Sequence, residues 1–235
     1  MAPLCQLKAH IENMPVKLII FDLDGTLLDT RLDIAKACNY ALKQCRCPER
    51  QLEEYNMMVG KGINNLFRAA LPEEMRSEVM VMKMKSHFLP YYDEHIDDSS
   101  KPYPGIIRML DLLSEHGIML AVASNKYQAG TEELVRRQLG YERFVKVLGQ
   151  REGKPLKPDP DIITEAMSAM PGISKEEVVY CGDSDVDMQT GINAGVRTIG
   201  VTWGFRSREE LAAYAPWHLA ANAEEIAEAI IADSE

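Results

Sequence analysis

The chain has 235 residues, of which 46% are hydrophobic and 26% are charged. These fractions are ordinary for a globular protein, and the length allows one large domain or a core domain that carries a smaller insertion. The net charge of −10 argues against unspecific binding to nucleic acid or to anionic membranes. No apolar stretch approaches the roughly 20 residues that a transmembrane helix requires. We therefore expect no nucleic-acid or membrane partner, and the oligomeric state stays open.

The cysteine content indicates a reducing compartment. There are five cysteines, an odd number, and none forms a CxxC pair, which fits the cytoplasm better than a disulfide framework. Cys45 and Cys47 have no second pair of ligands at a suitable distance, so we do not expect zinc there. Residues 1–13 show no clear pattern and no signal-type apolar core, and Met14 is an alternative start. We expect a cytoplasmic protein.

Two acids follow the first expected strand. Residues 18–21 form a short apolar run, typical of a buried parallel strand, and Asp22, Asp24 and Gly25 come directly after it. Because strand side chains alternate, both acids should project the same way from the carboxyl end, where open α/β sheets bind ligands. Two carboxylates about 4 Å apart repel by roughly 4 kcal/mol at an effective dielectric near 20. A proton or a divalent cation usually neutralises such a pair, so the pair predicts a metal-assisted active site.

Residues 31–98 show helical spacing without strand-like runs. The expected apolar faces are Leu32, Ala35, Cys38, Leu42 and Cys45 in one helix and Met75, Val79, Met82, Ser86 and Leu89 in another. We expect the methionines of this segment to serve as adaptable core packing: Met75, Met80, Met82 and Met84. Residues 97–105 are rich in Ser, Pro and Gly and indicate a linker.

Beyond this linker, strands and helices alternate. We expect strands over 118–123, 144–148, 178–181 and 198–202, and helices over 106–116, 131–139, 159–170, 185–194 and 223–231. Such alternation implies βαβ units and a mostly parallel sheet. The predicted fold is therefore α/β, a Rossmann-like parallel sheet flanked by helices. Its core comprises residues 14–30 and 99–235, and residues 31–98 form an all-helical insertion.

Reactive side chains gather where these strands end. They are Ser124, Asn125 and Lys126 after the second core strand, Lys154 and Lys157 in a proline-rich loop, and Asp183 and Asp187 after residues 178–181. The ends of parallel strands lie on one edge of the sheet, so these groups should converge near Asp22.

The ordered motifs identify a family resemblance. Asp22-x-Asp24-Gly25-Thr26, a strand ending in Ser124-Asn125, Lys157-Pro158-x-Pro160 and Gly182-Asp183-Ser184-x-x-Asp187 together resemble the haloacid dehalogenase superfamily of phosphohydrolases. Each motif alone is typical of a turn or a helix cap, but their order is specific, and the match spans roughly residues 17–220. Residues 24–30, Gly60-Lys61-Gly62 and residues 149–153 resemble phosphoglycolate phosphatases more narrowly.

This resemblance implies an Mg²⁺-dependent phosphatase with an inserted cap domain. By resemblance, Asp22 is the nucleophile that forms an aspartyl-phosphate, which splits a difficult hydrolysis into two steps. Asp24 protonates the leaving alkoxide and then activates water. Mg²⁺ would bind Asp22, the backbone carbonyl of Asp24 and Asp183, with Asp187 close by or through water.

The remaining roles concern the substrate, a small phosphorylated metabolite for which phosphoglycolate is the best guess. Ser124 and the Asn125 amide would hold phosphoryl oxygens, and Lys157 would neutralise charge in the transition state. Lys154 also precedes a proline, but Lys157 abuts the next helix as in the family. Charge alone suggests that Lys61, and Arg68 beside it, meet the carboxylate of phosphoglycolate.

Other readings stay open. A phosphomutase of the same superfamily, similar to β-phosphoglucomutase, would differ by retaining the phosphoryl group rather than releasing phosphate. A phosphono-aldehyde hydrolase would need a cap lysine that forms a Schiff base, for which Lys61 is a formal candidate, and a dehalogenase would need neither Asp24 nor the metal acids. A non-enzymatic phospho-receiver module also uses an aspartate, Mg²⁺, a hydroxyl and a lysine, but it is shorter and lacks the helical insertion.

Overall fold

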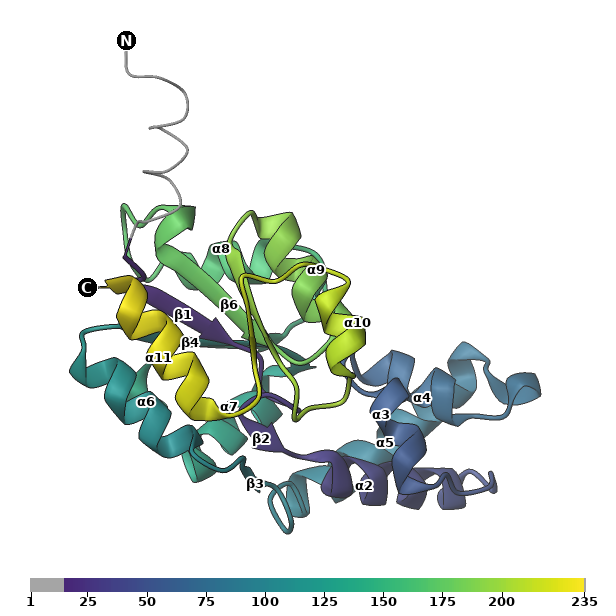
Figure 1. The fold of residues 1–235 in the computed structure, drawn as a ribbon. Coiled ribbons are helices and arrows are strands. Elements are labelled where there is room, and N and C mark those ends of the chain that lie inside the picture. The colour runs from purple at the N-terminus through teal and green to yellow at the C-terminus, as the bar shows by residue number, and fades with distance from the viewer. Residues whose placement is uncertain (1–14, 235) are drawn as a thin grey trace.

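The computed structural model describes residues 15–234, so Met14 and the segment before it lie outside the described residues. A six-stranded sheet runs through the centre of the molecule in the order β5-β4-β1-β6-β7-β8, and each adjacent pair is parallel (Figure 1). The strands are β1 (Leu18–Phe21), β4 (Met119–Tyr127), β5 (Phe144–Gln150), β6 (Val178–Gly182), β7 (Arg197–Val201) and β8 (His218–Ala220). The α/β class with a Rossmann-like parallel sheet is confirmed.

Helices cover both faces of this sheet, because each strand is apolar on both sides. Ile19 and Phe21 of β1 pack in a cluster with α6 (Ile106–Glu115), α7 (Gln128–Gln138) and α11 (Ala223–Ser234). Leu18 and Ile20 face the other way, toward α8 (Asp161–Met167) and the end of α9 (Asp185–Ala194). The short elements are α10 (Arg208–Ala212), η3 (Tyr141–Arg143) and η4 (Lys175–Glu177). None of the described helices has the length and apolar character that crossing a bilayer demands.

A helical insertion separates β1 from the rest of the sheet. It lies between β2 (Leu28–Asp29) and β3 (Lys101–Pro102), which pair antiparallel and hold the two crossing segments together. Its elements are α2 (Arg31–Gln44), η1 (Leu52–Glu54), α3 (Tyr55–Met58), α4 (Ile63–Ala70), η2 (Glu73–Met75) and α5 (Glu78–Glu94). Asp33 of α2 strengthens this junction, because its Oδ2 accepts hydrogen bonds from the backbone N–H groups of Ser99 and Ser100 at 2.8 and 2.7 Å.

The orientation of α5 differs from the sequence prediction. Val79 and Met82 were expected on the buried face, yet they are 82% and 59% exposed. The buried residues of this helix are Val81, Met84, Phe88 and Tyr92. A shift of two residues rotates a helix by about 200°, so an apolar pattern with the right period can lie on the wrong side. Of the expected methionines, Met84 is fully buried, and in α2 the expected core residue Leu32 is exposed.

Several short elements were missed, β2 and β3 among them, and other elements have different ends. Strand β8 and helix α10 are too short to leave a periodic pattern, and α8 ends at Met167 instead of residue 170. Strand β4 continues to Tyr127, four residues beyond its expected end, because Tyr127 pairs with Gln150 of β5 after an irregularity in the register. Ser124, Asn125 and Lys126 therefore belong to a strand and not to the loop that was expected.

Candidate active site

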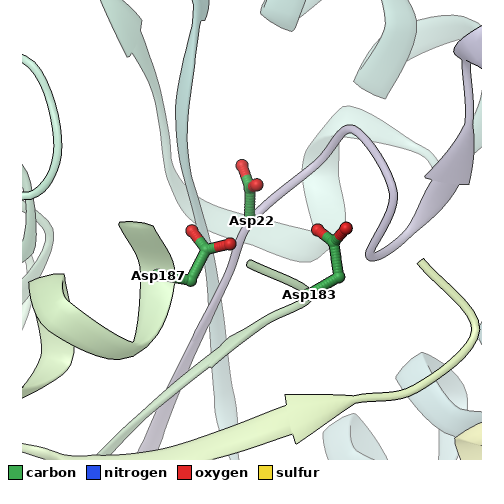
Figure 2. Close-up of side chains that lie close together, drawn as sticks. All are labelled: Asp22, Asp183 and Asp187. Atoms are coloured by element: carbon green, nitrogen blue, oxygen red, sulfur yellow. The ribbon is translucent and has the colours of Figure 1, made fainter. Parts of the chain in front are cut away.

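Three acids meet at the carboxyl edge of the sheet, beside its central strand. Asp22 follows β1, Asp183 follows β6, and Asp187 lies in the first turn of α9. Since β1 pairs with β4 on one side and β6 on the other, this is the position where the strand order reverses and where such sheets bind ligands. The three carboxylates are buried, point to the same side, and offer oxygens within 4.8 Å of one another (Figure 2).

Two glycines make room for these carboxylates. Gly25 has a φ of +88°, and a Cβ atom there would lie 2.5 Å from Asp183 Oδ2. A Cβ atom on Gly182 would lie 2.3 Å from the Cβ of Asp187. Any side chain at either position would displace an acid from the cluster, which gives the Asp-Gly and Gly-Asp sequences a physical reason. Asp183 is further held by Thr26 Oγ1 at 3.0 Å and by the backbone N–H of Phe205 at 2.7 Å.

Lys157 supplies the positive charge inside the cluster. Its Nζ donates to Asp187 Oδ1 at 2.7 Å and to the Tyr180 hydroxyl at 2.8 Å, and it lies 2.9 Å from Asp22 Oδ1. The contact with Asp22 is an ion pair. Asp22 Oδ1 is a buried oxygen that accepts no hydrogen bond in the described part of the chain. It remains available to a ligand.

The local electrostatics leave the site short of positive charge. Burial raises the pKa of Asp22 to about 7 against the opposing effect of Lys157, and burial together with Asp187 raises the pKa of Asp183 well above its usual range. Burial acts in the same direction on Asp187, but Lys157 and the hydrogen bonds from Ser184 and Tyr180 together outweigh it and lower the pKa of this carboxyl. Lys157 thus contacts two of the three buried acids, Asp22 and Asp187.

These residues fit a divalent cation. Mg²⁺ binds oxygen ligands at about 2.1 Å, so two of its ligands lie up to about 4 Å apart. The spread of the three carboxylates is comparable, and one oxygen of Asp22 has no hydrogen bond among the described residues. Carboxylate oxygen is also the donor type that Mg²⁺ prefers.

Ser124 and Asn125 lie beside these acids on β4. Ser124 is buried, and its Oγ accepts a hydrogen bond from the backbone N–H of Lys126 at 3.2 Å. Asn125 connects three segments: its Nδ2 donates to the carbonyls of Gly60 and Lys157, and its Oδ1 accepts from the backbone N–H of Lys157 at 2.9 Å. The side chain of Asn125 therefore fixes the Lys157 loop and contacts the insertion.

A pocket opens between the sheet edge and the insertion. The sheet edge contributes Asp22, Asp24, Ser124, Asn125, Lys126 and Tyr127. The insertion contributes mainly apolar side chains: Ile34, Val59, Gly60, Gly62, Ile63, Leu66, Phe88 and Tyr92. Four of the residues predicted for the site thus line one hollow, while Lys157, Asp183 and Asp187 lie behind Asp22.

Lys126 is a part of this pocket to which the sequence analysis gave no role. Its Nζ lies 3.0 and 3.1 Å from the two carboxylate oxygens of Asp24, and its side chain is 5% exposed. The ammonium also stands 4.7 Å from the ring centre of Tyr92, within the range of a cation–π contact. Thr30 Oγ1 donates to Asp24 Oδ1 at 2.7 Å. Strand alternation from Ser124 would have predicted the direction of Lys126 had the strand been extended.

The other candidate cations lie outside the pocket. Lys154 is on the surface, where its Nζ lies 2.9 Å from Asp161 Oδ2. Lys61 is 52% exposed and its Nζ lies 3.4 Å from Asp185 Oδ2, so it connects the insertion to α9. Arg68 pairs with Glu78 within the insertion. None of the three is among the described residues that line the pocket.

Comparisons with known proteins agree with this geometry. Residues 19–201 match the sequence profile described as haloacid dehalogenase-like hydrolase. The chain is 31% identical to a phosphoglycolate phosphatase of Mesorhizobium japonicum, over 81% of this chain and 85% of that protein. It is 30% identical to one of Vibrio parahaemolyticus, over 92% and 96%. A crystal structure of a candidate phosphoglycolate phosphatase from Lactobacillus delbrueckii superimposes with a TM-score of 0.85 at 32% identity, covering 92% of this chain and 99% of that one.

Proposed function

Because the chain belongs to the haloacid dehalogenase-like hydrolase family, we propose that it is an Mg²⁺-dependent phosphatase of small phosphorylated metabolites. The observation that carries this proposal is the buried oxygen of Asp22, which has no hydrogen bond among the described residues and lies beside two further acids at the mouth of a pocket. The best candidate substrate is 2-phosphoglycolate, since the relatives that cover most of the chain bear the name phosphoglycolate phosphatase.

In the proposed reaction, an Asp22 oxygen attacks phosphorus, the bond to the alkoxide breaks, and an aspartyl-phosphate forms. Asp24, which lines the same pocket, gives its proton to the leaving alkoxide. Asp24 then takes a proton from water as this water attacks the phosphorus of the intermediate. Phosphate leaves, and both carboxyl groups return to their starting state.

The other residues bind and orient the phosphoryl group. Ser124 Oγ and the Asn125 amide would donate to its oxygens, and Lys157 would balance the charge that develops on them. Asp22, the Asp24 carbonyl and Asp183 would hold Mg²⁺, with Asp187 close by and oriented by Lys157. When bound, the ion offsets the repulsion between the phosphate and Asp22.

We also propose that residues 31–98 act as a cap over a core of residues 14–30 and 99–235. The insertion supplies the apolar wall of the pocket, and its two connections pair as β2 and β3, which gives it a narrow hinge. A closed cap would exclude water and strengthen the electrostatic interactions within the pocket. The proposed setting is the reducing cytoplasm, since the four described cysteines are free thiols.

Phosphate release tests the function. Inorganic phosphate would be measured from 2-phosphoglycolate and a panel of other phosphoesters, with and without Mg²⁺, for the native chain and for Asp22→Asn. We expect the native chain to turn over substrate only when Mg²⁺ is present. In the variant, kcat should fall on the order of 10⁴- to 10⁶-fold, because the nucleophile is removed. Circular dichroism should show that the variant is folded. A native chain that released no phosphate from any ester, or a folded variant of equal activity, would contradict the proposal.

A further inference from the structure

Lys126 places a positive charge in a pocket whose insertion wall is mainly apolar. Among the described residues that line the pocket, it is the one lysine or arginine, and the facing wall consists of side chains such as Ile63, Leu66 and Phe88. A buried ammonium is costly unless an anion or a hydrogen-bond acceptor faces it. The interactions of Lys126 with the Asp24 carboxylate and the Tyr92 ring hold it there.

The position of Lys126 relative to Asp24 defines what it can reach. In the proposed reaction Asp24 contacts the bridging oxygen of the phosphoester, and the Lys126 ammonium lies 3.0 Å from the nearer Asp24 oxygen. The group that follows the bridging oxygen must therefore pass the ammonium as it enters the pocket. A negative group one or two carbons from that oxygen would lie within reach of Lys126, whereas a longer or neutral substrate would place apolar or uncharged atoms beside it.

The insertion wall of the pocket carries a hydroxyl group, that of Tyr92, close to Lys126. Tyr92 lines the pocket and is buried, and its hydroxyl makes no hydrogen bond with the described residues. A buried hydroxyl that is left unsatisfied is costly, so such a group is typically satisfied by water or ligand. Its ring already contacts the Lys126 ammonium.

From this geometry, and resting on the proposed function, we propose that Lys126 is the residue that selects the substrate. It binds a carboxylate one or two carbons from the ester oxygen, and Tyr92 holds the ammonium in place. The substrate class is then a short phosphomonoester with a second acidic group, of which 2-phosphoglycolate is one member. Lys126 takes the part that charge alone had suggested for Lys61 and Arg68, whose side chains pair with Asp185 and Glu78.

The test compares two substrates that differ in the carboxylate alone. We would measure kcat and KM for 2-phosphoglycolate and for ethyl phosphate with the native chain, with Lys126→Met, and with Lys83→Met. Met keeps the length of the side chain and suits an apolar wall. Lys83→Met removes the same charge from an exposed position on α5. A hydrogen-bonded charge pair contributes about 1.5–3 kcal/mol, so the preference of kcat/KM for 2-phosphoglycolate over ethyl phosphate should fall about 10- to 100-fold in Lys126→Met. It should stay unchanged in Lys83→Met.

Binding gives a readout that does not depend on turnover. In the Asp22→Asn background with Mg²⁺, calorimetry should show that Lys126→Met weakens 2-phosphoglycolate about as much as its kcat/KM falls, and ethyl phosphate much less. If Lys126→Met weakened both ligands equally, or left the preference intact, the assignment would be overturned. A native chain that hydrolysed neither ester would instead refute the proposed phosphatase, so the two failures are distinguishable.

Discussion

The sheet edge and the helical insertion contribute opposite kinds of surface to one pocket. The edge brings buried charges that are held by one another, such as the Lys157 ammonium between Asp22 and Asp187. The insertion brings an apolar wall that includes Ile63, Leu66 and Phe88. The edge therefore carries the ionisable groups, and the insertion carries the mainly apolar surface that faces them. Lys126 lies at the boundary, contacting Asp24 on one side and Tyr92 on the other.

This contrast has a consequence for stability. Charges that are buried together depend strongly on one another, so the loss of a single member should be costly at the edge. Exposed charges on the insertion exchange with water and are worth about 0–1 kcal/mol each. The same substitution should therefore change the free energy of unfolding more at the sheet edge than at an exposed position of the insertion or of the outer surface.

The largest contrast is expected between two lysines of one loop. Lys157→Met should reduce kcat by about 10²- to 10³-fold, because the charge facing the phosphoryl group is lost. It should also destabilise the fold by about 3–5 kcal/mol, because Asp187 and Asp22 lose their buried partner. Lys154→Met is the matched control: this lysine is exposed and pairs with Asp161, so kcat and the free energy of unfolding should hardly change. If both substitutions changed kcat and the free energy of unfolding equally, the proposed difference between buried charges at the sheet edge and exposed charges on the surface would be wrong.

An intermediate effect concerns pH and metal. Burial raises the pKa of Asp22 to about 7 from an unfolded value near 3.8, and burial together with Asp187 also raises the pKa of Asp183 above its usual range. A carboxyl with a raised folded pKa binds its proton more tightly in the folded state. Without metal, the raised pKa contributes fully to the free energy of unfolding below about pH 4. The contribution of Asp22 is lost as the pH rises to about 7. The metal-free protein should therefore lose several degrees of melting temperature between pH 5 and pH 8.

Mg²⁺ should oppose that loss, since it binds the deprotonated carboxylates. Melting curves at pH 5 and pH 8, with and without Mg²⁺, would show a larger stabilisation by the ion at pH 8. Asp22→Asn serves as the control, because it removes one titrating group and should flatten the pH dependence of the metal-free protein. A metal-free protein that was more stable at pH 8 than at pH 5 would contradict the raised pKa values of these carboxyl groups.

The sequence predicted the edge better than the insertion, for a physical reason. Asp22 and Asp183 each follow directly on a buried apolar strand, so the local pattern fixes where their side chains emerge. The pocket wall comes from separate helices whose rotation depends on tertiary packing, and the apolar spacing of Val79 and Met82 pointed to the wrong face of α5. The sequence pattern consequently did not predict that Tyr92 lines the pocket.

Lys126 was expected near Asp22, but its direction and role escaped prediction for a related reason. A loop was expected after residue 123, and loop residues have no fixed alternation, so no direction could be assigned to this side chain. The pairing of Tyr127 with Gln150, which extends β4, is a long-range contact between strands. A single-sequence pattern contains no information on that pairing, although the two-residue spacing from Ser124 was present.

The smallest effect is expected at Lys61, where the insertion meets α9. Its ion pair with Asp185 is longer than a hydrogen bond and largely exposed, so Lys61→Ala should change the free energy of unfolding by less than about 1 kcal/mol. Because Lys61 does not line the pocket, KM for 2-phosphoglycolate should rise by less than about threefold. Steady-state kinetics would check this against Lys126→Met. A rise of tenfold or more in Lys61→Ala, confined to the carboxylated substrate, would instead mean that Lys61 leaves Asp185 and meets the substrate, and the selecting charge would then belong to the insertion rather than to the sheet edge.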